Sequence, residues 1–167
     1  YSYNGWQYRC VCSSQTAAAD TTSNAATLTV FRTVTISQDP QPQSAVAPSA
    51  ATFSVTASTA DGAALTYAWD KSEDNSVWLQ IPGATSSSYT TTSTTYDSGG
   101  VPPASFDADN GDYFRCRVNS TGATEVTSAS AQLTVTRSLV VTDHPDNTTG
   151  AVGGTADFSV TAAISDG

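Results

Sequence analysis

The sequence predicts an all-β protein made of tandem antiparallel β-sandwiches, and three observations lead to this prediction. Apolar and polar residues alternate along most of the chain, which is typical of strands that bury one face. Turn pairs such as Asp61-Gly62 and Asn110-Gly111 separate the alternating runs. The third observation is an internal repeat, because Phe53–Ala57 recurs without change as Phe158–Ala162, 105 positions later.

The repeat divides the chain into one complete module and two partial ones. Asn4-Gly5 recurs as Asn110-Gly111, 106 positions later, and Ala26–Val30 is similar to Ala131–Val135. This period is about the size of one sandwich domain, roughly 100 residues. We therefore predict the C-terminal part of one module in residues 1–30, a complete module in residues 31–136, and the N-terminal part of a further module in residues 137–167. We expect the chain to be a stretch of a longer polypeptide.

Four alternating runs define the predicted core of the complete module. They are Thr52–Ala57, Leu65–Trp69, Phe114–Val118 and Ala131–Val135, and they are rich in the valine and threonine that suit a pleated sheet. No segment shows a sustained helical period, which favours a sandwich of two sheets. The side chains predicted to form the structural core are Phe53, Val55, Trp69, Phe114, Cys116 and Leu133.

The order of two landmarks predicts an immunoglobulin-like sandwich. Trp69 falls on the third strand and Cys116 on the sixth, and in immunoglobulin-like folds a core tryptophan packs near this cysteine. The second strand carries Phe53 in place of a cysteine, so we expect Cys116 to be a buried thiol that packs as a small apolar residue. Cys10 and Cys12 share one face of a strand, and their oxidation state stays open.

Longer runs of the sequence resemble a family of bacterial and phage immunoglobulin-like repeats. These runs are Leu65–Ser72, Trp78–Thr90, Asn110-Gly111 before Arg115-Cys116, and Ser23–Val30. Such repeats occur in tandem on virion structural proteins of tailed phages, notably those of marine cyanobacteria, and on bacterial surface proteins. The resemblance implies a spacer, a decoration or an adhesive module. The stretch Tyr96–Phe106 departs from the family and looks like an insertion in a loop, with a role that stays open.

Composition excludes several classes of partner. The chain has 15 acidic and 6 basic residues, for a net charge of −9, so it lacks the clustered cations that bind nucleic acid or anionic lipid. It also has no apolar run of about 18 residues, so we expect no membrane insertion. The expected partners are neighbouring modules of the same chain, other virion or surface proteins and, for an adhesive module, host surface glycans.

An acidic cluster is the main candidate for a metal site. Asp107, Asp109 and Asp112 surround the Asn110-Gly111 turn, and alternating carboxylates of a loop can bind Ca²⁺. The spacing of an EF-hand loop is not met, and Trp6 stands in the earlier copy where Asp112 stands here. A polar turn explains the cluster more simply, so we expect no cofactor.

Three aromatic residues are candidates for a ligand-binding face. Trp78, Tyr89 and Tyr96 could together contact a sugar or a protein. By its spacing Trp78 lies on the strand after Trp69, and we favour the interpretation that it helps to cover the core.

No catalytic arrangement is expected. His144 is the only histidine and lies in the linker after the complete module, so that module cannot hold a serine–histidine–aspartate triad. We expect a non-catalytic structural or adhesive module of a phage virion protein, in a tail, a fibre or a capsid decoration. The alternatives are a repeat of a bacterial cell-surface or secreted adhesin, and a carbohydrate-binding appendage of a larger enzyme. The expected location is the virion surface or the extracellular space, with the bacterial cell surface as the alternative.

Overall fold

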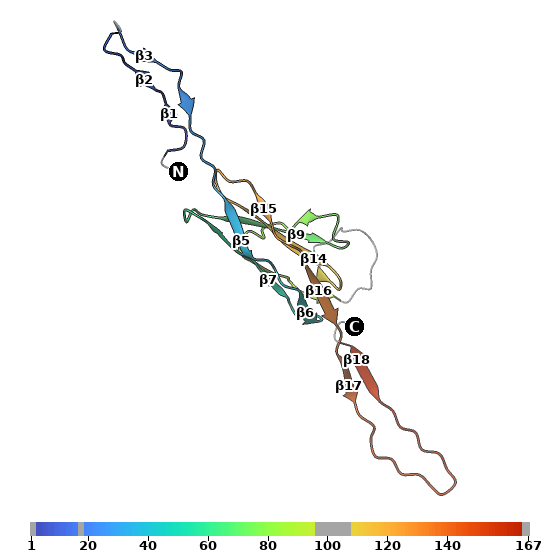
Figure 1. Ribbon diagram of the computed structural model, residues 1–167. Helices are drawn as coiled ribbons and strands as arrows, with labels where there is room; N and C mark the ends of the chain where they lie inside the picture. Colours follow the sequence, from blue (N-terminus) through green and yellow to red (C-terminus); the bar gives the residue numbers. More distant parts are fainter. Residues whose placement is uncertain (1–2, 17–18, 96–107, 165–167) are drawn as a thin grey trace.

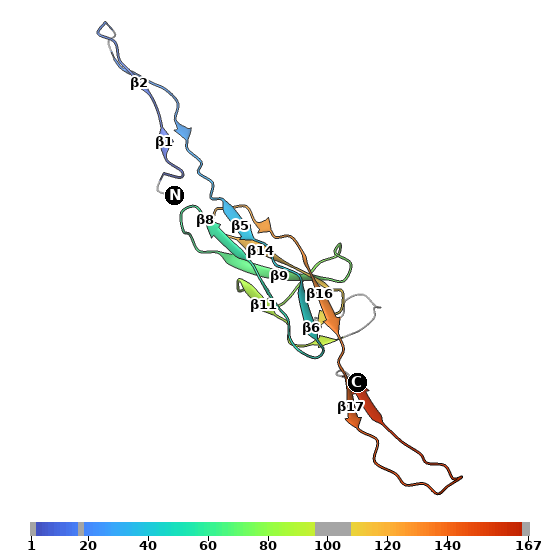
Figure 2. The same ribbon diagram turned by 60° about the horizontal axis from the view of Figure 1, so that its bottom comes forward.

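The computed structural model describes residues 3–16, 19–95 and 108–164, and these residues form an all-β structure. A central β-sandwich carries one hairpin at each end (Figure 1). The two hairpins remain at opposite ends when the molecule is turned (Figure 2), so the chain is elongated. Among the described residues, none lie in a helix that is both long and apolar enough to span a bilayer.

The larger sheet of the sandwich contains the strands on which most of the core is built. Its order is β10-β9-β14-β16-β6, and β15 pairs with β14 beside this path. The pairings are antiparallel except that β6 runs parallel to β16, which departs from the purely antiparallel sandwich that the sequence predicts. The strands are β6 (Gln43–Val46), β9 (Thr66–Ser72), β10 (Leu79–Gln80), β14 (Tyr113–Asn119), β15 (Val126–Thr127) and β16 (Ala131–Thr136).

The opposing layer is built from two antiparallel pairs, β5 with β8 and β7 with β11. The predicted run Thr52–Ala57 is thus two short strands with different neighbours, separated at Val55. The chain leaves this layer after β5 and joins the larger sheet at β6, and Pro40, which has no N–H to donate, lies at this crossing. The strands are β5 (Val34–Gln38), β7 (Thr52–Ser54), β8 (Thr56–Thr59) and β11 (Ser88–Thr90), and a further parallel pair joins β12 (Thr94–Thr95) to β13 (Ala108–Asp109).

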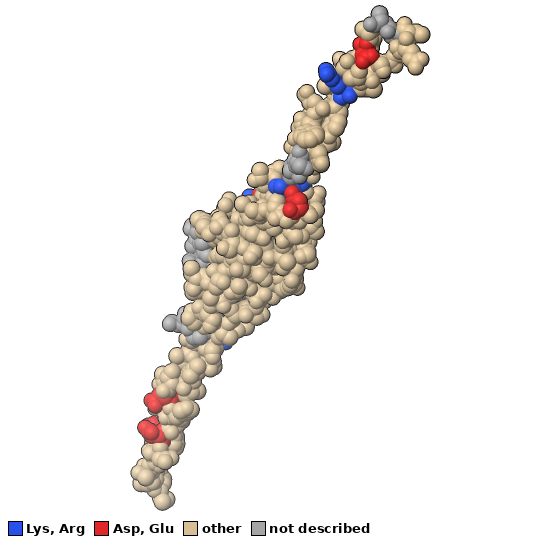
Figure 3. Space-filling model, turned by 90° about the vertical axis from the view of Figure 1, so that its left-hand side faces the viewer, with Lys and Arg blue, Asp and Glu red and all other residues tan. Residues whose placement is uncertain are grey.

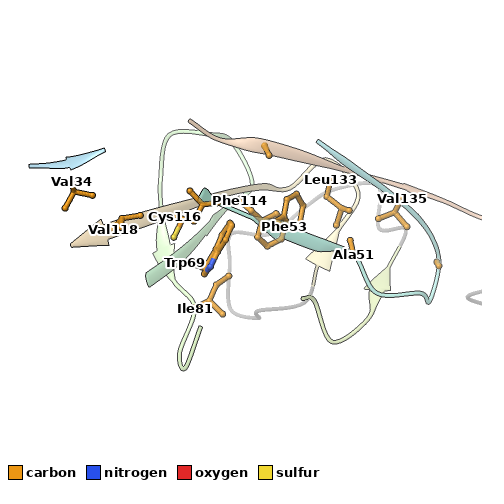
Figure 4. Close-up of a cluster of buried hydrophobic side chains, with 13 residues drawn as sticks. Val34, Ala51, Phe53, Trp69, Ile81, Phe114, Cys116, Val118, Leu133 and Val135 are labelled. Carbon is orange, nitrogen blue, oxygen red and sulfur yellow. The ribbon is translucent and has the colours of Figure 1, made fainter. Parts of the chain in front are cut away.

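The core lies between the two layers and is centred on aromatic side chains (Figure 4). Trp69 stands opposite Cys116 in the register of β9 and β14, and its Nε1 donates a hydrogen bond to the carbonyl of Ser86 at 2.9 Å. Phe53 stacks on Phe114 with the ring centroids 4.5 Å apart, which joins the two layers. All of the side chains predicted to form the core are buried, namely Phe53, Val55, Trp69, Phe114, Cys116 and Leu133.

The N-terminal hairpin has the same hydrogen bonds as the hairpin of β14 with β15 and β16. Asn4 Oδ1 accepts a bond from the backbone N of Val30 at 2.8 Å, and Asn110 Oδ1 accepts one from Val135 N at the same distance. The backbone N of Cys10 also bonds to a serine hydroxyl, as the N of Cys116 does in the sandwich. The hairpin consists of β1 (Gln7–Tyr8), β2 (Val11–Cys12), β3 (Thr21–Thr22) and β4 (Ala26–Thr27).

The C-terminal hairpin repeats the pairing of β5 with β8. Its register shifts between Val141 and Asp143, and the register of β5 and β8 shifts between Ile36 and Gln38, 105 positions earlier. A β-bulge at the same place in both pairs shows that the sequence repeat is also a structural repeat. The hairpin consists of β17 (Leu139–Asp143) and β18 (Thr161–Ile164).

Candidate functional sites

Arg32 lies where the N-terminal hairpin meets the sandwich, and its side chain holds two loops of the sandwich together. Its Nε and Nη2 donate to the carboxylate of Asp61 at 2.9–3.1 Å. Its Nη1 donates to the carbonyl of Thr121 and, at 3.3 Å, to Ser120 Oγ. Its backbone N donates to the carbonyl of Gly122 at 3.1 Å. We call this set of contacts the arginine clamp.

The charges of the clamp are partly shielded from water. The side chain of Arg32 is 15% exposed and that of Asp61 is 38% exposed. The hydrogen bonds from Arg32 hold the pKa of the Asp61 carboxyl below its ordinary value, so this carboxyl group is ionised at neutral pH. A small cavity beside the pair is lined by Val30, Phe31, Arg32, Thr33, Ala60 and Asp61.

The clamp makes the connection between hairpin and sandwich very short. The backbone N of Val30 is bonded within the hairpin, to Asn4 Oδ1, and the backbone N of Arg32 is bonded within the sandwich, to Gly122 O. Phe31 is therefore the residue between these two anchoring hydrogen bonds. A connection this short leaves few backbone dihedrals about which the two parts can turn.

The residues of the clamp recur in the sequence at the period of the module. Arg137 and Asp166 stand 105 positions after Arg32 and Asp61. The strand that leads to Arg137 is anchored by the bond from Val135 N to Asn110 Oδ1, as the strand before Arg32 is anchored at Asn4. Asp166 lies outside the described residues. The sequence alone did not reveal the clamp, although Arg32 and Asp61 recur at the same offset as the Phe53–Ala57 repeat.

A second candidate site is the outer face of β9 and β14. Asp70 is 3% exposed there, and it accepts hydrogen bonds from Arg115 Nε at 3.2 Å and from Arg117 Nε at 2.9 Å. The hydrogen bond with Asp70 raises the pKa of Arg117, which also lies 3.6 Å from Glu125. The guanidinium of Arg115 lies 4.1 Å from the ring centroid of Trp78. This face therefore combines an aromatic ring with arginines that form ion pairs with carboxylates.

The three aromatic residues proposed as a ligand face occupy different environments. Tyr89 packs toward the core, with its ring 6.2 Å from that of Trp69 and 5.8 Å from that of Phe114, and burial raises its pKa. Trp78 is partly exposed, and its ring lies against the guanidinium of Arg115. The expectation that Trp78 covers the core is therefore wrong, because it is not among the residues packed against the hydrophobic core. Tyr96 lies outside the described residues.

The acidic cluster is also divided. Asp112 is buried, and its carboxylate lies 2.9 Å from Lys71 Nζ. Asp107 and the side chain of Asp109 lie outside what the structure describes. Within the described part of the chain, no three histidine, cysteine, aspartate or glutamate side chains are grouped as a metal site requires.

The cysteines are free thiols in two different settings. Cys116 is buried, and its burial raises the thiol pKa to about 11, so it is a thiol rather than a thiolate at neutral pH. Cys10 and Cys12 are exposed, and their Sγ atoms are 3.7 Å apart.

Comparisons with known proteins show the family of the chain but not its function. A family model described as a domain of unknown function, DUF8696, matches residues 33–137. The chain belongs to this family. No curated protein matches the chain. Among solved structures, the chain is similar to Sidekick-1 immunoglobulin domains 1-5, with 20% identity and a TM-score of 0.42 over 95% of this chain and 33% of that one. The chain thus spans about a third of the length of that structure.

Proposed function

We propose that this chain is a non-catalytic structural segment of a phage virion protein, in which DUF8696 modules in series act as a stiff spacer. The observation that carries the proposal is the one-residue connection between the hairpin and the sandwich, at Phe31. A tether would instead have a long connection rich in glycine and serine.

The path of the chain supports a spacer. The chain enters the sandwich at β5, at the end that faces the N-terminal hairpin, and leaves from β16 at the opposite end (Figures 1 and 2). Each module placed in this way adds its long dimension to the array. Modules of this kind in a tail, a fibre or a capsid decoration would hold a terminal part at a distance from the particle.

The surface suits a role without strong binding. The broad side of the sandwich seen in Figure 3 carries very few charged side chains. The chain is rich in serine and threonine, and its net charge of −9 makes neighbouring copies repel one another. A weak adhesive contribution would come from the face of Trp78 and Arg115, because aromatic rings and arginines stack on and hydrogen-bond to sugars.

Two other functions fit the same fold, namely a bacterial surface or secreted adhesin repeat and a carbohydrate-binding appendage of an enzyme. The resemblance to phage repeats favours the virion. Immunogold labelling with an antibody against the central sandwich tests the choice on purified virions and on uninfected cells. We expect label on the virion alone, whereas label on the uninfected cell surface would contradict the proposal and support an adhesin.

The spacer and the weak binder are separated by a glycan array probed with the native chain and with Trp78→Ala. A spacer gives no signal with either protein. A signal that the native chain gives and Trp78→Ala loses assigns recognition to the outer face of β9 and β14.

A further inference from the structure

The only lysine of the chain is not on the surface. Lys71 is the sole lysine among 167 residues, and its side chain is 4% exposed. Lysine is among the residue types that are least often buried, because removing its ammonium group from water costs free energy. Lys71 lies on β9 two positions after Trp69, so the two share the face of the strand that points into the sandwich.

The group that faces this amine is a carboxylate that is equally buried. Asp112 is 3% exposed at its side chain, and its Oδ2 lies 2.9 Å from Lys71 Nζ. In the register of β9 and β14, Lys71 stands opposite Phe114, whose buried ring follows Asp112 by two positions. The amine and the carboxyl group therefore meet beside an aromatic side chain and away from bulk water.

We propose that Lys71 and Asp112 condense within the folded protein into an intramolecular isopeptide bond. The reaction begins when the ammonium group passes a proton to the carboxylate that it contacts, which frees the nitrogen lone pair. The nitrogen lone pair then attacks Cγ of Asp112, the C–N bond forms and the C–OH bond breaks. Of the three ammonium hydrogens, one remains on the amide nitrogen and two leave with the oxygen as water.

The geometry favours this reaction through proximity and burial. The nitrogen is already in contact with the carboxyl group, so the reaction requires no diffusion of the two groups toward each other. Burial limits the access of the water that would reverse the condensation. The product joins β9 covalently to the segment that precedes β14, and these two strands form the most extensive pairing of the larger sheet. The bond would thus stabilise the centre of the module without any disulfide.

Mass spectrometry of the intact native chain tests the proposal directly. After incubation in the folded state and denaturation, the chain should be lighter than its sequence by the mass of one water. Amine labelling of the denatured chain should modify the α-amino group only, because Lys71 carries the other amine. Proteolysis should yield a branched peptide that contains both Lys71 and Asp112, with no tryptic cleavage after Lys71.

Variants locate the bond and control for effects on folding. Asp112→Ala and Lys71→Arg should have the full sequence mass, and Asp112→Asn should lose ammonia in place of water. Asp70→Asn is the matched control, because Asp70 is also a buried carboxylate of the same sheet but bonds to arginines, and this variant should still lose water. A native chain of full mass with two reactive amines, or water loss that maps to other residues, would overturn the proposal and leave a buried ion pair.

Discussion

The two copies of one pentapeptide allow a sharp test of where the core lies. Phe53 and Phe158 occupy the same position in the repeat, but Phe53 is 0% exposed and Phe158 is 67% exposed. Phe53→Ala removes a ring that stacks on Phe114 at 4.5 Å and leaves a cavity between the two layers. Substitutions of this kind cost about 3–5 kcal/mol. In the 167-residue chain, which holds only the first part of the further module, the same change at Phe158 removes few contacts and should cost less than about 0.5 kcal/mol.

Urea denaturation followed by tryptophan fluorescence measures both variants. For Phe53→Ala we expect a lower midpoint with an unchanged slope, and a free energy of unfolding reduced by about 4 kcal/mol. A loss of this size is a large part of the stability of a domain, which is typically about 5–15 kcal/mol. A cost below about 1 kcal/mol for Phe53→Ala, or an equal cost for Phe158→Ala in this chain, would show that the core does not lie around Phe53.

Three further predictions concern the clamp, the buried thiol and a turn. Arg32→Met keeps the apolar stem of the side chain but breaks the arginine clamp. Two spin labels, one on the N-terminal hairpin and one on the sandwich, should then show a broader distribution of distances than in the native chain. Cys116 should resist thiol reagents at neutral pH in the folded protein and react after denaturation, because burial raises its pKa to about 11; rapid reaction in the folded state would contradict this. Hydrogen bonds from the Ser76 hydroxyl and backbone lower the pKa of Asp74 in the folded protein. The ionised Asp74 therefore contributes to stability above about pH 4, and this contribution is lost as the pH falls further. Asp74→Asn should remove that part of the acid dependence, as measured by thermal unfolding at a series of pH values.

The sequence was sufficient to predict which side chains form the core of the sandwich, and its repeat predicted the structural repeat. Alternation along Phe114–Val118 and the order of Trp69 and Cys116 indicate which side chains face inward, and the structure buries them. The same alternation places Lys71 on the inward face with Trp69, but a lysine is normally expected in water. Its burial depends on Asp112, which is distant in sequence and becomes its neighbour only through the pairing of β9 with β14.

Other features required the tertiary structure. Asp70 alternates outward, yet it is buried because Arg115 and Arg117 cover it from the neighbouring strand. Tyr89 lies on a strand of three residues, which is too short for its period to show which way it faces. The clamp at Arg32 was visible as a repeated pair, but the hydrogen bonds that give the pair a role join loops far apart in the sequence.

We expect each module to be joined stiffly to the next. The most direct measurement is the distribution of distances between spin labels on two adjacent modules, in a polypeptide that carries this module between complete neighbours. The one-residue connection at Phe31 predicts a single narrow distribution in the native protein. A broad distribution in the native protein, equal to that of Arg32→Met, would show that the modules are joined flexibly and do not form a stiff spacer.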